Sequence, residues 1–135
     1  MELIKHGDQT LALVYRDENW APGLNFPTPD DYFVQAGCWQ YEKGKKLRSH
    51  YHKVYERTTN LTQELTYVKK GRMKVILFDD QQKKVKEFEL KTGDFAIMVS
   101  GGHGYEILED GTQVLEVKNG PFVSVEKDKE LINDL

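Results

Sequence analysis

Two histidines separated by one residue are the part of the sequence with the clearest chemical potential. His50 and His52 lie in GKKLRSHYHK, within a stretch, Lys46–His52, that is predicted to be a strand. Alternate side chains of a strand point to the same face, so both imidazoles and Arg48 project side by side. Two imidazoles held in this way are a natural pair of metal ligands, and without a metal they suit proton transfer near neutral pH. The plainer interpretation is a pair of surface or core histidines that bind nothing.

Two later segments carry further polar residues in patterned sequence. Glu64 begins the alternating run ELTYVKKGRMKVILF, and His103 lies in the glycine-rich stretch SGGHGYEIL. Counting alternate positions places Thr66 on the face of Glu64 and Tyr105 on the face of His103. With Arg48, whose guanidinium can bind a carboxylate or phosphate, these side chains are candidates to shape a pocket. The plainer interpretation makes Arg48 a solvated charge and Tyr105 a wall residue.

The spacing of these residues resembles the cupin family. The family's first motif is G-x5-H-x-H-x(3–4)-E-x6-G. Five residues fit its two halves: Gly44, His50, His52, Glu64 and Gly71. The linker is longer here, because eleven residues separate His52 from Glu64. Glu56 follows His52 at the family's usual distance, but Gln63 stands where that alignment needs glycine, so Glu64 is the preferred carboxylate.

The family's second motif, G-x5-P-x-G-x2-H-x3-N, is only partly present. Gly93, Gly101 and His103 are recognisable, with one residue fewer between the last two. Val99 replaces the proline, and Ile107 stands where asparagine is usual. The first motif is therefore the more specific of the two.

The resemblance, which spans roughly residues 40–120, implies both a fold and a metal centre. The fold is all-β: a small antiparallel β-barrel, or double-stranded β-helix, of the jelly-roll type. Four side chains would converge inside its mouth as metal ligands: His50, His52, Glu64 and His103. Three imidazoles and one carboxylate suit a first-row divalent ion (Fe, Mn, Ni, Cu or Zn) and leave room for water or substrate.

Three functions are compatible with this resemblance. The first is a metal-dependent isomerase, epimerase or dioxygenase that acts on a sugar or another small polar molecule. Arg48 would favour a substrate that carries an anionic group. The second is a metal-free enzyme, because RSHYHK resembles a motif of cupin-type nucleotide-sugar ketoisomerases; His50 and His52 would then be the catalytic residues. The third is a non-catalytic module that binds a sugar or another small ligand. The sequence does not choose among them, since fold does not specify function.

These residues require a set of short strands to position them. The runs between turn signals predict nine strands: Leu11–Tyr15, Tyr32–Tyr41, Lys46–His52, Glu64–Val68, Met73–Phe78, Val85–Leu90, Phe95–Val99, Tyr105–Leu108 and Val114–Val117. Asp79–Gln82 is expected to form a hairpin turn, and Gly93 and Gly111 to adopt positive φ. One helical turn is conceivable in Asn60–Tyr67, and a short helix or frayed end in Lys127–Leu135.

Length and composition bound the remaining possibilities. The chain has 135 residues and a net charge of −3, which predicts one domain over 1–135 and argues against nucleic-acid binding. Within it, N-terminal strands and a loop run to about 40, the cupin motifs over about 44–107, and a tail over about 121–135. Cys38 is the only cysteine, so an internal disulfide is excluded.

The cellular location and the oligomeric state can also be predicted from the sequence and from the resemblance. There is no apolar run long enough for a membrane span and no secretory signal, which predicts a cytoplasmic protein without a membrane partner. Small cupins usually form homodimers. Five aromatic residues of the N-terminal part are candidate interface anchors: Trp20, Phe26, Tyr32, Phe33 and Trp39.

Overall fold

The computed structural model describes residues 1–134, and its secondary structure is almost entirely strand. The ten strands are β1 (Glu2–His6), β2 (Gln9–Tyr15), β3 (Gly23–Asn25), β4 (Cys38–Gln40), β5 (Glu64–Lys70), β6 (Arg72–Phe78), β7 (Lys84–Lys91), β8 (Phe95–Met98), β9 (Gly102–Ile107) and β10 (Gln113–Lys118). A 3-10 turn covers Asp17–Asn19, and one short helix, α1, covers Val125–Asp128. All strand pairs are antiparallel, which confirms the predicted all-β class.

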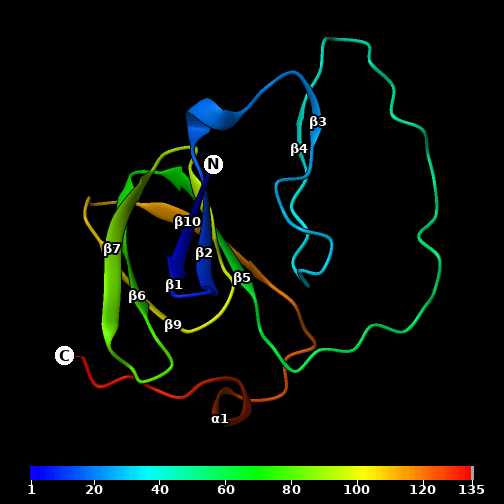
Figure 1. Cartoon of the computed structure of the whole chain (residues 1–135). Helices are drawn as coiled ribbons and strands as arrows, with labels where there is room; N and C mark the ends of the chain where they lie inside the picture. Colours follow the sequence, from blue (N-terminus) through cyan, green and yellow to red (C-terminus); the bar gives the residue numbers. More distant parts are fainter. Residues whose placement is uncertain (135) are drawn as a thin grey trace.

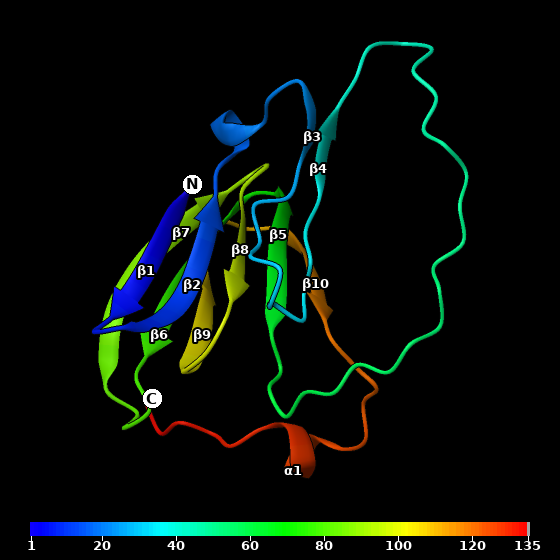
Figure 2. The same cartoon turned by 45° about the vertical axis from the view of Figure 1, so that its right-hand side comes forward.

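Two sheets form the body of the molecule (Figures 1 and 2). The larger has the strand order β1-β2-β8-β5-β10, and the smaller has the order β7-β6-β9. A separate two-stranded ribbon, β3–β4, stands beside them. No strand pairing joins the two main sheets within residues 1–134, so the expected closed barrel is not present there.

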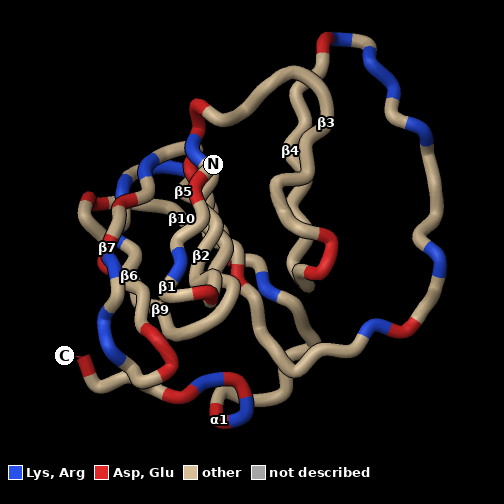
Figure 3. Tube along the Cα trace, viewed as in Figure 1, with Lys and Arg blue, Asp and Glu red and all other residues tan. Residues whose placement is uncertain are grey.

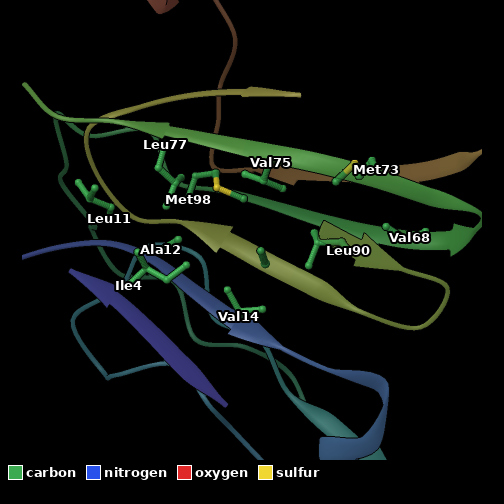
Figure 4. Packing of buried hydrophobic residues seen from close by; sticks show 11 residues of the cluster. Ile4, Leu11, Ala12, Val14, Val68, Met73, Val75, Leu77, Leu90 and Met98 are labelled. Carbon is green, nitrogen blue, oxygen red and sulfur yellow. The ribbon is translucent and has the colours of Figure 1, made fainter. Parts of the chain in front are cut away.

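The main core lies between the two sheets, because each contributes a face of alternating apolar side chains. Figure 4 shows this cluster. Its buried members are Ile4, Leu11, Ala12, Val14, Val68, Met73, Val75, Leu77, Leu90, Ala96 and Met98. In β6 the alternation Met73, Val75, Leu77 directs every second residue into this layer. Tyr105 and His103 of β9 pair with Val75 and Leu77 and therefore face the same layer.

The outer face of the larger sheet is covered by an irregular segment around residues 32–38. This second core contains Leu13, Tyr15, Val34, Cys38, Phe95, Ile97 and Val99. Because both faces of β2 and β8 are covered, these strands are buried along nearly their whole length.

Most of the predicted strands and turns are confirmed. The predictions for β2, β5, β6, β7, β8, β9 and β10 match to within a few residues. The Asp79 carboxylate accepts hydrogen bonds from the backbone N–H groups of Gln81 (2.9 Å) and Lys83 (3.0 Å), which fixes the β6–β7 turn. Gly93 and Gly111 have the expected positive φ values of 91° and 74°.

Three sequence predictions are wrong within the described residues, and two short strands were not predicted. Lys46–His52 is not a strand, because it packs against no neighbour and pairs with none. Tyr32–Tyr41 shortens to β4, since the part before Cys38 serves as irregular cover for the second core. No helical turn occurs in Asn60–Tyr67. β1 and β3 were not predicted, although Ile4 of β1 reaches the main core. The tail forms α1 mostly ahead of the predicted Lys127–Leu135, whose last residue lies outside the described part of the chain.

Candidate functional site

A pocket of about 670 Å³ opens at the end of the molecule where β5 and β9 meet the C-terminal segment. Its inner wall is formed by Glu64, His103, Tyr105 and Glu116. The β6–β7 turn and the glycines before His103 form one side, and residues 128–134 form the other. The pocket therefore lies at the open end of the layer between the two sheets.

Glu64 is directed into the pocket by the first residues of β5. Glu64, Thr66 and Val68 alternate toward the inter-sheet layer, while Leu65 and Tyr67 pack on the second core. The preceding residue, Gln63, is buried. Its side-chain oxygen accepts hydrogen bonds from the backbone N–H groups of Phe33 (2.8 Å) and Val34 (3.2 Å). The N–H of Gln63 donates to Asn119 Oδ1 at 2.8 Å. These bonds fix the start of β5 and with it the Glu64 carboxylate.

His103 and Tyr105 reach the same point from β9. In the β6–β9 register they pair with Leu77 and Val75, which are core residues, so both point inward. The chain enters β9 through Gly101, whose φ is 72° and where a Cβ would lie 2.5 Å from the Phe78 carbonyl oxygen. Only glycine fits this turn, and the turn sets the register that brings His103 to Glu64.

The three side chains form a connected group. The Tyr105 hydroxyl donates a hydrogen bond to Glu64 Oε1 at 2.7 Å. His103 Nε2 lies 3.5 Å from the same oxygen, and the centroids of the His103 and Tyr105 rings are 5.3 Å apart. Glu64 is 5% exposed and its two partners are about a third exposed, so the carboxylate lies at the base and the rings face the pocket.

The charge of Glu64 is stabilised by its neighbours. Burial by itself raises the pKa of this carboxyl, but hydrogen bonds from His103, Tyr105 and Glu116 outweigh it and lower the pKa to about 2. The pKa of Glu116 is raised, chiefly by its hydrogen bond to Glu64, so a proton between the two carboxyls is held by Glu116. Burial and the bond to Glu64 raise the pKa of Tyr105, which stays a neutral donor.

Two features of the site were not evident in the sequence. Glu116 faces Glu64 only because β10 pairs with β5 in a register that sets Glu116 opposite Thr66. The second feature is the Thr66 side chain, which is 2% exposed and lies beside the Tyr105 hydroxyl, behind the residues that line the pocket. No sequence signal specified the partner strand of β10.

Arg48, His50 and His52 are not at this pocket. They lie in a segment, residues 41–62, in which every side chain is exposed and which loops away from the sheets (Figure 1). The two imidazole centroids are 5.0 Å apart, and His50 Nδ1 lies 3.0 Å from the Arg48 carbonyl oxygen. Glu56, the alternative carboxylate, is on the same segment. The structure thus brings together Glu64, Thr66, His103 and Tyr105, and leaves the other predicted site residues apart.

Two residues of the pocket have side chains of the kind that bind metal ions. A carboxylate oxygen and an imidazole nitrogen facing one cavity are suitable donors for a first-row divalent ion. Within residues 1–134, no group of three or more His, Cys, Asp or Glu side chains is arranged to hold a metal ion. Glu64 and His103 therefore fit such an ion by the chemistry of their donor atoms, as two ligands of an incomplete set.

None of the helices in the described part of the chain has the length and apolar character that crossing a membrane requires.

Comparisons with known proteins add no identification. Searches against protein-family models, curated proteins and solved structures found no match.

Proposed function

We propose that this protein is a metal-dependent, cupin-like enzyme that acts on a small polar molecule. The observation that carries the proposal is the position of His103 and Glu64, 3.5 Å apart at the base of a pocket between two antiparallel sheets. These are two of the four ligands that the sequence motifs predict. His50 and His52 would supply the other two. The jelly-roll layout would be completed if the segment that carries them packed against the two sheets.

The 41–62 segment has the properties needed to close on the pocket. Tyr51 and Val54 are almost fully exposed, so the segment gains by packing against the body. It leads directly into Glu64, and the twelve residues from His52 can span up to roughly 40 Å. β9 is an edge strand of its sheet, and an edge strand accepts an added strand. Pairing of residues 46–52 with β9 would place His50 and His52 beside His103.

The chain's own residues would then divide the work. His50, His52, Glu64 and His103 hold the ion, which when bound supplies a Lewis acid for a substrate oxygen. Tyr105 fixes the orientation of the Glu64 carboxylate through its 2.7 Å hydrogen bond. Glu116, with its raised pKa, is placed to hold a proton at the pocket wall.

Elemental analysis of untagged protein tests this function. Near-stoichiometric metal is expected in the wild type and loss of metal in Glu64→Gln, in His103→Ala and in the double variant His50→Ala/His52→Ala. Glu56→Gln is the matched control and should retain metal, because the proposed centre takes its carboxylate from Glu64 and not from Glu56, although both His50 and Glu56 lie on the exposed segment. Absence of metal after soaking, or loss only in Glu56→Gln, would contradict the proposed centre.

A metal-free acid–base enzyme is the second candidate. The position of His103 favours it, because an imidazole that faces the pocket and is oriented by the Glu64 carboxylate, 3.5 Å away, can move protons next to a keto group. This candidate predicts turnover of a keto-sugar nucleotide in excess EDTA. Activity that EDTA abolishes would exclude it, and saturable binding without any product would indicate a non-catalytic module instead.

We also propose a homodimer formed through the N-terminal aromatic residues. Phe26 and Trp39 are more than half exposed, and Trp20 and Phe33 are more than a third exposed, on and near the β3–β4 ribbon. Large aromatic side chains of this kind are typical interface anchors.

A further inference from the structure

The chain that follows α1 covers one side of the pocket. It runs across one end of both main sheets, from α1 toward the β6–β7 turn (Figures 1 and 2). Residues 129–134 make up this C-terminal segment, and all of them except Asn133 line the pocket. Access to the pocket therefore depends on where the segment lies.

The helix that precedes the segment is fixed to the body of the molecule. Asp128 ends α1, and its carboxylate pairs with Lys118 Nζ at 3.2 Å and accepts a hydrogen bond from the Thr62 hydroxyl at 3.4 Å. At the start of the helix, the Ser124 hydroxyl accepts a hydrogen bond from the backbone N–H of Lys127 at 3.3 Å. These bonds fix the point at which the C-terminal segment begins.

Polar contacts do not hold the segment itself. Within residues 1–134, no hydrogen bond or ion pair joins residues 130–134 to another part of the chain, and the backbone bond from Asp134 to Ile132 is internal. Figure 3 shows carboxylate residues on the chain after α1 and also on the β6–β7 turn, which forms the opposite side of the pocket. Because like charges repel, these groups do not attract the segment to the turn. An element with so few bonds opens at a low cost in free energy.

One apolar side chain attaches the segment to the body. Ile132 is the one residue of the segment that is partly buried, whereas its neighbour Leu131 is 86% exposed. Ile132 packs against Gly102 and lies beside Phe78, whose side chain is buried at the end of β6. This contact therefore determines whether the segment stays on the pocket.

The glycine at position 102 provides the space for this contact. Gly102 does not have a positive φ, so its backbone does not require glycine as that of Gly101 does. A Cβ at Gly102 would lie 2.6 Å from Ile132 Cδ1 and 3.2 Å from Phe78 Cβ. Any larger residue would displace the isoleucine, which gives the second glycine of the pair a role that the strand itself does not explain.

We propose that the C-terminal segment is a lid on the pocket, hinged at α1 and held closed by Ile132 against Gly102. This inference goes beyond the proposed function, because it concerns access to the pocket whatever the pocket binds. Gly102 directly precedes His103 on β9, so release of Ile132 exposes His103 to solvent and widens the entrance for a ligand.

NMR and chemical modification of EDTA-treated protein test the lid. An NOE is expected in the wild type between the Ile132 δ-methyl group and the α-protons of Gly102. Diethyl pyrocarbonate modifies neutral imidazoles, and peptide mass spectrometry gives a separate rate for each histidine. The His103 side chain is 29% exposed with the lid closed, so it should react slowly. His50 and His52 lie on the exposed 41–62 segment and serve as internal references.

Substitutions on both sides of the contact should open the lid. Ile132→Asp should raise the His103 modification rate at least about threefold, because a charged group gains nothing from packing on glycine and phenylalanine. Leu131→Asp is the matched control, since it adds the same charge at an exposed neighbour and should leave the rate unchanged. A chain that ends at Lys129 lacks the lid and should react like Ile132→Asp. Gly102→Ala should also raise the rate, because its Cβ occupies the space of the Ile132 methyl group.

The outcomes separate the lid from a general loss of structure. A faster reaction at His103 with unchanged rates at His50 and His52 would uphold the proposal. Absence of the NOE, equal His103 rates in wild type and Ile132→Asp, or an equal rise in Leu131→Asp would overturn it. The truncated chain gives an independent test if Ile132→Asp does not fold. Because neither metal nor substrate is present, failure of the proposed metal centre would leave these results unaffected.

Discussion

The hydrogen bond from Tyr105 to Glu64 offers the sharpest test of the site as described. Tyr105→Phe removes one oxygen atom and leaves the ring in place on β9. It deletes the 2.7 Å bond to Glu64 Oε1, while His103 and Glu116 remain as partners of the carboxylate. The variant should therefore keep the fold and change only the stability of the ionised carboxyl.

The magnitude follows from the type of bond. A hydrogen bond to a charged group contributes about 1.5–3 kcal/mol, and one pKa unit corresponds to about 1.4 kcal/mol. Because the Tyr105 side chain is partly exposed, we expect the lower end of this range. The pKa of Glu64, about 2 in the wild type, should rise by roughly one unit. The free energy of unfolding at neutral pH should fall by about 1–2 kcal/mol.

The pH dependence fixes the sign of the effect. The pKa of Glu64 is lower in the folded protein than its unfolded value of 4.5, so its ionised form stabilises the fold above that pH. This contribution is lost as the pH falls toward 2, where the carboxyl becomes protonated in both states. The stability difference between wild type and Tyr105→Phe should consequently be largest near neutral pH and shrink in acid.

Two measurements on metal-free protein are sufficient. Carbon-detected NMR of labelled glutamate follows the titration of Glu64, and urea unfolding at several pH values gives the stability difference. Tyr67→Phe is the matched control, because Tyr67 lies on the opposite face of β5 and packs on the second core. An unchanged Glu64 titration in Tyr105→Phe would refute the hydrogen-bonded group on which the site is built.

Three further outcomes are expected. Gly101→Ala should lower stability by about 2 kcal/mol or more in urea unfolding, because of its positive φ and the 2.5 Å approach of a Cβ to the Phe78 carbonyl; stability equal to wild type would contradict the turn geometry. Zn²⁺ should slow amide hydrogen exchange in residues 46–52 of the wild type but not of His50→Ala/His52→Ala, and equal exchange in both would argue against closure of the segment. Sedimentation should give twice the 15.7 kDa chain mass, and Trp39→Ala should shift the protein toward the monomer; a wild-type monomer at micromolar concentration would remove the dimer.

The strands that could be predicted are those whose pattern is local. The alternation Met73, Val75, Leu77 and the turn residues Asp79 and Gly93 depend on near neighbours, and the structure has them as expected. The same period of two placed Tyr105 on the face of His103 and Thr66 on the face of Glu64. These inferences needed no knowledge of which strands pair.

Features that depend on which strands pair with each other could not be predicted from the sequence. Glu116 reaches Glu64 because β10 pairs with β5, a choice that its own residues do not encode. Lys46–His52 has the side-chain alternation of a strand, but a strand also needs a neighbour for its backbone groups, and here it has none. The expectation that His50 and His52 share the site with Glu64 and His103 stays a prediction for the same reason.

The exposed 41–62 segment connects two parts of the chain that also contact each other directly. β2 pairs with β8 from Ala12↔Met98 to Tyr15↔Phe95, and side chains from both pieces form each of the two cores. A protease that cut at this segment would therefore leave a nicked but assembled protein, in which residues before the cut complement those after it. In the nicked protein, β2 of the N-terminal piece would still pair with β8 of the other piece, although no peptide bond would connect the two. Two separately expressed fragments could be mixed to rebuild the sheets, with His50 and His52 placed on either one.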